Sequence, residues 1–358
     1  MAAQKAKLAA GVALIAFALG CASAPPPLRP LTALELEEER VDPEMRAVLA
    51  CIDHGPYPDH SPQALLQRDR ALWDGLGPLA IPRLEVAQVL DLRVEGLSGP
   101  VPLRVYRPIK ATGLLPAIIY LHGGEYTAGS LDLYDSTLRA LAQRSRAVLV
   151  AVGYRLAPEA PFPAALTDVD VALRWAYGHA DELGADKDRL ALAGDDAGAT
   201  LALAEAVALG GAGHGGPALR ALALAYPLAD ARMQSASWRK FGNKGYLLSV
   251  DGFGRALGFY LGAKTSPADP RVSPALLAQA DLARLPPTLV LTAEFDPARD
   301  DDELLADKIG KAGGKVEVRR SSGLVHGFLL VAGAVEVAAE ALNGMGSWLQ
   351  DALAPARH

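Results

Sequence analysis

The segment from Gly194 to Gly198, with the sequence Gly-Asp-Asp-Ala-Gly, constrains the fold of this chain more than any other. An apolar run over 189–193 precedes it and has the character of a buried strand, and an alanine-rich run over 199–207 follows it and has the character of a helix. The two glycines permit a strained turn in which backbones pass close to one another. A strand, a sharp turn and a helix therefore present one central side chain, Asp196, at the end of a sheet.

Further buried runs also end in polar residues. The runs over 116–121, 287–292 and 315–320 read as strands, and helix-like segments lie between them. This alternation predicts an α/β fold with a mostly parallel central sheet flanked by helices. We expect Leu84–Val94 and Leu103–Arg107 to form the first, antiparallel strands.

The residues that follow these runs have the order of a catalytic triad. Asp196 comes first, Asp296 follows the run over 287–292, and His326 follows the run over 315–320. Nucleophile, acid and histidine in this chain order distinguish one triad fold from the others. We therefore interpret Asp296 as the residue that orients His326, with Asp196 at the nucleophile position.

The motifs together resemble the hormone-sensitive-lipase-like esterases, an α/β-hydrolase family with a helical cap. The likeness spans roughly residues 84 to 350 and rests on the following segments: His122–Gly124, Tyr154–Pro163 (YRLAPEAPFP), Gly194–Gly198, Tyr226–Asp230, Asp269–Pro274, Asp296–Asp300 and His326–Phe328. The resemblance implies a carboxylester hydrolase that needs no metal or organic cofactor and acts on a small-molecule substrate. It also implies an oxyanion hole, and the backbone groups expected to form it are those of Gly123, Gly124, Glu125 and Ala197.

The same resemblance divides the chain into segments. Residues 31–82 are expected to form an N-terminal helical part of the cap, with helix-like runs over 31–41 and 61–73. Ser61 followed by Pro62 is a helix-start signal. Residues 83–355 form the α/β-hydrolase domain, with a cap insertion near 233–261.

Two residues depart from the family pattern. Asp196 stands where the family has serine, and Glu125 stands at the third glycine of the HGGG loop. A serine needs histidine as a general base, whereas a carboxylate is already ionised at neutral pH. A carboxylate that adds to an ester carbonyl is, however, a better leaving group than the alkoxide, so the intermediate returns to reactants. Efficient turnover of esters is therefore not expected.

Attack on a saturated carbon is a different case. Displacing a halide or opening an epoxide leaves a stable alkyl ester on Asp196, which His326 can hydrolyse by activating water. Haloalkane dehalogenases and epoxide hydrolases, relatives on the same fold, use aspartate at this position. The halide-binding tryptophan that usually follows it is absent, since Ala197 stands there, and the candidate acids for an epoxide are Tyr126, Tyr246 and Tyr260.

Three interpretations remain open at the level of sequence. The chain is a hydrolase with altered or impaired catalysis, a catalytically inactive relative that binds a small ligand in the capped pocket, or a scaffold that binds a protein partner. In the inactive case, Asp196 forms an ion pair with His326. Asp195 and His122 are interpreted as supports of the turn and the HGG loop, and Arg155 and Glu159 as a structural ion pair or loop scaffold.

The first 24 residues have the build of a signal peptide. Lys5 and Lys7 precede an apolar stretch over 8–19, and Cys21 follows small residues in a way that resembles a bacterial lipoprotein signal. We expect lipidation at Cys21, a Pro-rich tether over 25–30 and a membrane-anchored location in the bacterial cell envelope, or otherwise a periplasmic or secreted protein. The formal net charge of −6 gives no basic footprint for nucleic acid.

Overall fold

The computed structural model describes residues 40–52, 59–110, 112–210 and 216–355. The predicted signal peptide with Cys21 and the tether over 25–30 lie outside the described residues, as does most of the helix expected over 31–41. Within the described ranges, no helix is long and apolar enough to cross a membrane.

Eight strands form one sheet in the order β1-β2-β4-β3-β5-β6-β7-β8. Their bounds are Gln88–Val94 (β1), Val101–Arg107 (β2), Leu115–Leu121 (β3), Val148–Val152 (β4), Ala185–Asp195 (β5), Leu219–Ala225 (β6), Thr288–Ala293 (β7) and Val316–Ser321 (β8). β1 with β2 and β2 with β4 are antiparallel, and all the other pairs are parallel. The mostly parallel sheet predicted from the sequence is confirmed.

The first strand starts later than predicted. It begins at Gln88 rather than at Leu84, because backbone pairing with β2 begins only at Ala87, whose N–H donates to the carbonyl oxygen of Arg107 at 2.8 Å. β5, in contrast, extends beyond the run over 189–193 and continues as far as Asp195. Its extension carries the chain directly into the Gly194–Gly198 turn.

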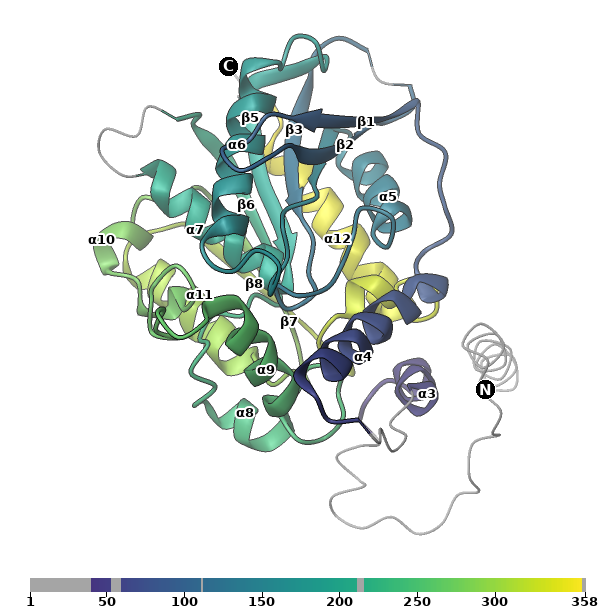
Figure 1. Ribbon diagram of the computed structural model, residues 1–358. Coiled ribbons are helices and arrows are strands. Elements are labelled where there is room, and N and C mark those ends of the chain that lie inside the picture. Colours follow the sequence, from purple (N-terminus) through teal and green to yellow (C-terminus); the bar gives the residue numbers. More distant parts are fainter. Residues whose placement is uncertain (1–39, 53–58, 111, 211–215, 356–358) are drawn as a thin grey trace, which may run out of the picture.

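Helices cover both faces of the sheet (Figure 1). Side chains of α6 (Ala164–Gly178), α7 (Asp196–Gly210) and α11 (Arg299–Lys311) pack in one apolar cluster with the strands. Those of α5 (Asp135–Ser145) and α12 (Glu336–Ala352) belong to a second cluster. The strands β3 and β4 are buried at every position, as a sheet covered on both faces requires.

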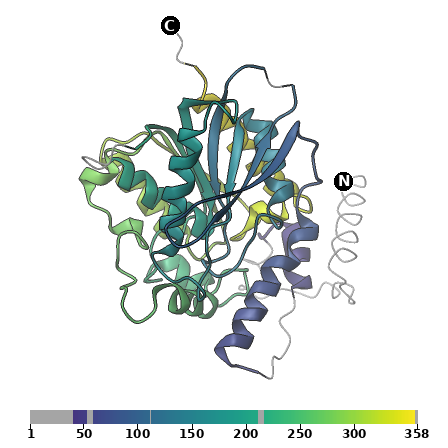
Figure 2. The ribbon, with the colours of Figure 1, turned by 45° about the horizontal axis from the view of Figure 1, so that its top comes forward.

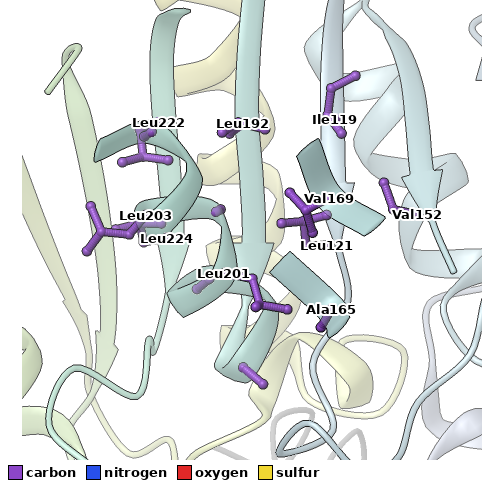
Figure 3. Packing of buried hydrophobic residues seen from close by; sticks show 14 of the residues in the cluster. Ile119, Leu121, Val152, Ala165, Val169, Leu192, Leu201, Leu203, Leu222 and Leu224 are labelled. Atoms are coloured by element: carbon purple, nitrogen blue, oxygen red, sulfur yellow. The ribbon is translucent and has the colours of Figure 1, made fainter. Parts of the chain in front are cut away.

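Alternate residues of the central strands supply the first cluster (Figure 3). Leu192 on β5 and Leu222 and Leu224 on β6 face α7, which contributes Leu201 and Leu203. This packing fixes the start of α7 against the carboxyl end of β5. It thereby holds the Gly194–Gly198 turn in place.

A second group of helices lies beyond the carboxyl ends of the parallel strands (Figure 1). It comprises α4 (Pro62–Gly75), α8 (Ala236–Phe241) and α9 (Val250–Leu261), and α3 (Pro43–Cys51) lies near α4 at one edge of the molecule (Figure 2). Ser61 caps α4 by accepting a hydrogen bond from the N–H of Ala64, as its sequence predicted. Arg255 of α9 pairs with Asp69 of α4 at 2.9 Å, so segments far apart in the sequence meet above the sheet.

Candidate active site

The turn between β5 and α7 forms the centre of the site. Asp196 is the first residue of α7 and has a left-handed φ of 50°, a conformation that costs energy for a residue other than glycine. A Cβ atom at Gly198 would lie 2.0 Å from the carbonyl oxygen of Leu121, and one at Gly194 would lie 2.7 Å from the same atom. The two glycines are therefore required because α7 starts in contact with the end of β3.

The structure brings Asp196, Asp296 and His326 together. His326 Nδ1 lies 2.9 Å from Asp296 Oδ2, and His326 Nε2 lies 3.3 Å from Asp196 Oδ1. All three side chains are completely buried, with 0% exposure. The histidine thus lies between two carboxylates that come from different strand ends.

Backbone donors hold the other oxygen of the Asp196 side chain. The N–H groups of Gly124 and Glu125 both donate to Asp196 Oδ2, each at 2.6 Å. One carboxylate therefore contacts the histidine through Oδ1 and fills the two-donor pocket through Oδ2. Two hydrogen bonds from backbone amides stabilise negative charge on Oδ2.

The other two predicted donors are placed differently. The N–H of Gly123 is directed to the hydroxyl oxygen of Tyr134 at 3.0 Å and to Asp195 Oδ1 at 3.1 Å. Ala197 is buried in the first turn of α7, next to Asp196. Of the four predicted groups, the N–H groups of Gly124 and Glu125 are thus the ones that donate to the Asp196 carboxylate.

The loop that carries these donors has an unusual backbone. Gly124, Glu125 and Tyr126 are consecutive and have φ values of 121°, 50° and 63°. A Cβ atom at Gly124 would lie 2.2 Å from the carbonyl oxygen of Ala128, so only glycine fits there. This curvature turns two successive N–H groups toward the same oxygen atom.

The buried charges perturb the ionisable groups of the site. Burial alone would lower the pKa of His326, but the negative charges of Asp296 and Asp196 and their hydrogen bonds raise it well above its usual value. Burial, followed by repulsion from Asp196, raises the pKa of Glu125 to about 8. The raised pKa of His326 thus follows from its place between Asp196 and Asp296, and the raised pKa of Glu125 follows mainly from its burial.

His122 supports the loop. Its Nδ1 lies 2.8 Å from the carbonyl oxygen of Gly123, and its ring stacks on Tyr154 at 4.4 Å between centroids. The Tyr154 hydroxyl donates to the backbone carbonyl of His122 at 2.6 Å. Burial lowers the pKa of His122 to about 4, so it is neutral and fits a structural role.

Tyrosines around Asp195 are functional-site residues that the sequence interpretation did not identify. The hydroxyl groups of Tyr120 and Tyr134 donate to Asp195 at 2.8 and 2.7 Å, and that of Tyr226 lies at 3.3 Å. Tyr120 lies near the end of the strand predicted over 116–121, and Tyr226 begins the segment Tyr226–Asp230 on which the family resemblance rests, and these positions were the available signals. Tyr134 precedes a helix and offered none.

The ion pair suggested for Arg155 and Glu159 is not formed. Arg155 pairs with Asp168 of α6 at 2.8 Å, and Glu159 pairs with Arg70 of α4 at 2.7 Å. The two side chains diverge because each meets a different helix. They act as a loop scaffold, which was the other half of the interpretation.

The three tyrosines suggested as acids for an epoxide lie in aromatic clusters. Tyr126 stacks on Tyr260, with ring centroids 3.9 Å apart. Tyr246 packs against Phe241 and Phe295. Among residues 40–52, 59–110, 112–210 and 216–355, no group of three or more His, Cys, Asp or Glu side chains is placed to hold a metal ion.

Comparison with known proteins agrees with this fold. A family model described as the alpha/beta hydrolase fold matches residues 118–330. The chain is 35% identical to Esterase LipI of Mycobacterium tuberculosis, over 86% of this chain and 93% of that protein, and 38% identical to Carboxylesterase NlhH of the same species, over 74% and 82%.

The chain is also similar to solved structures of esterases. A thermostable esterase from Pseudomonas putida superposes with a TM-score of 0.80 at 29% identity, covering 88% of this chain and 98% of that one. EstE1, a thermophilic carboxylesterase cloned from a metagenomic library, superposes with a TM-score of 0.76 at 36% identity, covering 82% and 98%.

Proposed function

Because the chain belongs to the α/β-hydrolase family, we propose that it is a hydrolase of the esterase/lipase type whose chemistry is carried by Asp196. The substrate is a small-molecule carboxylic ester or a related electrophile. The single observation that supports an altered reaction is the position of the Asp196 carboxylate, which reaches His326 with one oxygen and the N–H groups of Gly124 and Glu125 with the other.

This position disfavours ordinary ester hydrolysis. Polarisation of a substrate carbonyl requires its oxygen to accept the hydrogen bonds of the two N–H groups, but Asp196 Oδ2 already accepts them at 2.6 Å. Addition of Oδ1 to an ester carbonyl would also be reversed, because a carboxylate leaves more readily than an alkoxide. Both effects impair catalysis on carboxylic esters.

The same position favours attack on a saturated carbon. Asp196 Oδ1 forms a bond to the electrophilic carbon while the bond from that carbon to its leaving group breaks, and the leaving group takes the electron pair. Asp196 becomes a neutral alkyl ester whose carbonyl oxygen is Oδ2. Because Oδ2 stays between the N–H groups of Gly124 and Glu125, these donors now polarise the ester carbonyl of the protein itself.

Hydrolysis of this alkyl ester completes the cycle. Formation of the ester removes the negative charge of Asp196 next to His326, so the pKa of the imidazole falls, its proton is released and it becomes a base. His326 takes a proton from water, and the hydroxide adds to Cγ of Asp196. The intermediate expels the alkoxide, which takes its proton from His326 to give an alcohol, and the carboxyl group left on Asp196 releases the second proton of the water to become a carboxylate.

A second function is favoured by the closed state of the site. The three side chains Asp196, Asp296 and His326 have 0% exposure and satisfy one another by hydrogen bonds. A site closed in this way also suits a catalytically inactive relative that binds a small ligand or a protein partner.

Comparing three proteins separates these functions: the parent, Asp196→Ser and His326→Ala, each assayed with p-nitrophenyl acetate, styrene oxide and 1-bromobutane. We expect the parent to consume an epoxide or a bromoalkane, and His326→Ala to stop after one covalent addition to Asp196. Asp196→Ser is expected to gain ester hydrolysis. An exposed histidine replaced as His60→Ala is the matched control and leaves all activities unchanged.

Other outcomes overturn the proposal. A parent that leaves all three compounds intact, while Asp196→Ser hydrolyses the ester, identifies an intact scaffold that is catalytically inactive in the parent. Rapid hydrolysis of p-nitrophenyl acetate by the parent contradicts the leaving-group argument.

We also propose that the protein is anchored in the bacterial cell envelope through a lipid on Cys21. The supporting feature is the sequence alone: a short apolar stretch over 8–19, small residues before Cys21 and a Pro-rich segment after it. Metabolic labelling with a palmitate analogue tests this proposal. The expected label disappears in Cys21→Ser and persists in Cys51→Ser, and an unlabelled parent would contradict the proposal.

A further inference from the structure

The loops that carry Asp296 and His326 leave two neighbouring strands from the same level. β7 ends at Ala293 and β8 ends at Ser321, and these two residues are paired in the sheet. The chain takes more residues to reach the histidine from β8 than to reach the aspartate from β7, yet His326 Nδ1 and Asp296 Oδ2 lie 2.9 Å apart. The longer loop must therefore take up the extra residues in a bulge before it reaches the site.

Backbone hydrogen bonds between the two loops show where this bulge lies. The N–H of Glu294 donates to the carbonyl oxygen of Ser321 at 3.0 Å. The next N–H, that of Phe295, donates to the carbonyl oxygen of Leu324, also at 3.0 Å. The residues between these two acceptors form the bulge, in which Gly323 has a left-handed φ of 75°. The conformation of the bulge therefore sets how the loop before the histidine lies against the loop of the aspartate.

The side chain of Glu294 closes the bulge. In a regular parallel pair, the N–H of Gly323 would donate to the backbone carbonyl oxygen of Glu294. That carbonyl oxygen instead accepts a hydrogen bond from Arg299 Nη1 at 2.6 Å. The N–H of Gly323 donates to Glu294 Oε2 at 3.0 Å, so the side chain replaces the backbone acceptor.

A segment from the other end of the described chain, residues 40–42, covers the opposite side of the bulge. The N–H of Asp42 donates to the carbonyl oxygen of Gly323 at 2.8 Å. A Cβ atom at Gly323 would lie 3.0 Å from the Asp42 nitrogen, so the two backbones are in close contact. Arg40 forms an ion pair with Glu294 Oε1, and Val41 is 1% exposed. We call residues 40–42 the strap.

We propose that Glu294 is a positioning residue, which fixes the loop before His326 so that the imidazole meets Asp296. Glu294 holds the N–H of Gly323, and the strap holds its carbonyl oxygen. Both polar groups of the bulge are therefore fixed by partners from outside the loop. Glu294 acts through the loop and not on the substrate.

The consequence for catalysis falls on one half of the reaction, and this part of the inference rests on the function proposed above. Formation of the alkyl ester needs the Asp196 carboxylate, whereas its hydrolysis needs His326 oriented as a base. A displacement of about 1 Å at a catalytic group can cost about 100-fold in rate. We therefore expect Glu294→Ala to slow hydrolysis of the alkyl ester by about 100-fold and to leave its formation unchanged, so that the ester accumulates.

The kinetic experiment compares Glu294→Ala, Glu294→Gln and Glu303→Ala with the parent. The amide oxygen of glutamine still accepts the N–H of Gly323, so Glu294→Gln should recover most of the rate of hydrolysis although it loses the ion pair with the strap. Glu303 is the matched control, because its carboxylate also joins β7 to β8, through Thr292 Oγ1 at 3.1 Å and Arg320 Nε at 2.7 Å. Intact-protein mass spectrometry follows formation and loss of the ester with 1-bromobutane and with styrene oxide.

Nitrogen-15 NMR of the His326 ring gives a readout that needs no substrate. The Nδ1 signal reports the hydrogen bond to Asp296, and Asp296→Ala gives the position of this signal when the bond is lost. We expect Glu294→Ala to move the signal toward that position, and Glu294→Gln and Glu303→Ala to keep the signal of the parent. Gly323→Ala should move it as Glu294→Ala does, because the added Cβ atom meets the strap.

Each contrary outcome has a distinct meaning. A parent-like Nδ1 signal in folded Glu294→Ala, or an equal shift in Glu303→Ala, shows that Glu294 only joins the two strands and overturns the inference. Equal slowing of formation and hydrolysis of the ester overturns it as well. If Glu294→Ala does not fold, a parent-like signal in Gly323→Ala overturns the inference. If no alkyl ester forms in any variant, the proposed function is wrong, and the nitrogen-15 signals then decide the inference alone.

Discussion

Asp195 and Asp196 are neighbours in the chain, and both are completely buried, yet the two sides of the turn hold them in opposite ways. On the β5 side, Asp195 lies among the hydroxyl groups of Tyr120, Tyr134 and Tyr226. On the α7 side, Asp196 lies between His326 and two backbone N–H groups. The Asp195 carboxyl is surrounded by neutral hydroxyl donors. The Asp196 carboxyl contacts the His326 ring and the two backbone N–H groups that bind negative charge.

The difference shows that partners, rather than burial, decide what a buried carboxyl does. Burial raises the pKa of Asp195 to about 7 even though the Tyr134 hydrogen bond lowers it. Its donors are fixed by tyrosine rings and satisfy its oxygens, so it serves as an anchor for the turn. Asp196 Oδ1 lies 3.3 Å from Nε2 of His326, the residue that activates water in the proposed mechanism.

The largest effect that separates the two residues is expected for Asp196→Asn. An amide is a poor nucleophile, so turnover of an epoxide should fall by about 10⁴-fold or more. The free energy of unfolding should change by about 1 kcal/mol or less, since the amide oxygen keeps the two backbone donors. Steady-state kinetics and urea unfolding measure the two effects. A large loss of stability together with the loss of turnover would show that Asp196 anchors the turn as Asp195 does.

Asp195→Ala should have the reverse profile. It leaves the hydroxyl groups of Tyr120 and Tyr134 and the N–H of Gly123 without their buried acceptor, which should lower the free energy of unfolding by about 3 kcal/mol or more. Urea unfolding followed by circular dichroism measures this loss. Retention of full stability would show that the tyrosine cluster does not anchor the turn.

Asp195→Asn separates charge from hydrogen bonding. The pKa of Asp195 is raised to about 7 in the folded state, so its contribution to stability is present below its unfolded value of 3.8 and is lost as the pH rises through about 7. The free energy of unfolding of the parent should therefore fall relative to that of Asp195→Asn as the pH rises from about 4 to about 7. Unfolding measured across this range checks the sign, and a relative gain for the parent would contradict it.

A smaller effect is expected in the titration of His326. Its raised pKa means that the contribution of the imidazolium to stability is present below the unfolded value, about 6.5, and is lost as the pH rises through the folded value. Asp196→Asn removes one of the two charges that raise the pKa, so titration should move to lower pH. Nitrogen-15 NMR of the imidazole detects the shift, and Asp195→Asn should move it less, because Asp195 does not contact the ring.

The smallest effect is expected for Tyr120→Phe. It removes one of the donors to Asp195 while Tyr134 and Gly123 remain, so the free energy of unfolding should fall by about 1 kcal/mol. Turnover should be unchanged, since Tyr120 does not contact Asp196. A loss of turnover without a loss of stability would indicate that the two sides of the turn are coupled more closely than the contacts suggest.

Much of the site was predictable because it follows strand ends. Buried strands that lead to Asp196, Asp296 and His326 bring those residues to one edge of a parallel sheet. Their proximity therefore followed from the pattern of apolar runs and from the order of the three residues in the chain. Contacts between side chains of different elements were not predictable. The suggested pairing of Arg155 with Glu159 was wrong, since adjacency in a loop does not indicate which helix each side chain meets.

The sequence by itself determined the sheet, the turn with Asp196 at its centre and the presence of an acidic residue at position 125. Only the tertiary structure decided that Asp196 Oδ2 fills the two-donor pocket, that three tyrosines surround Asp195 and that Glu125 is buried. The physical reason is that hydrogen bonds and pKa shifts depend on distances of a few ångström between elements remote in sequence. Periodicity specifies which residues share a strand end, but it does not specify those distances.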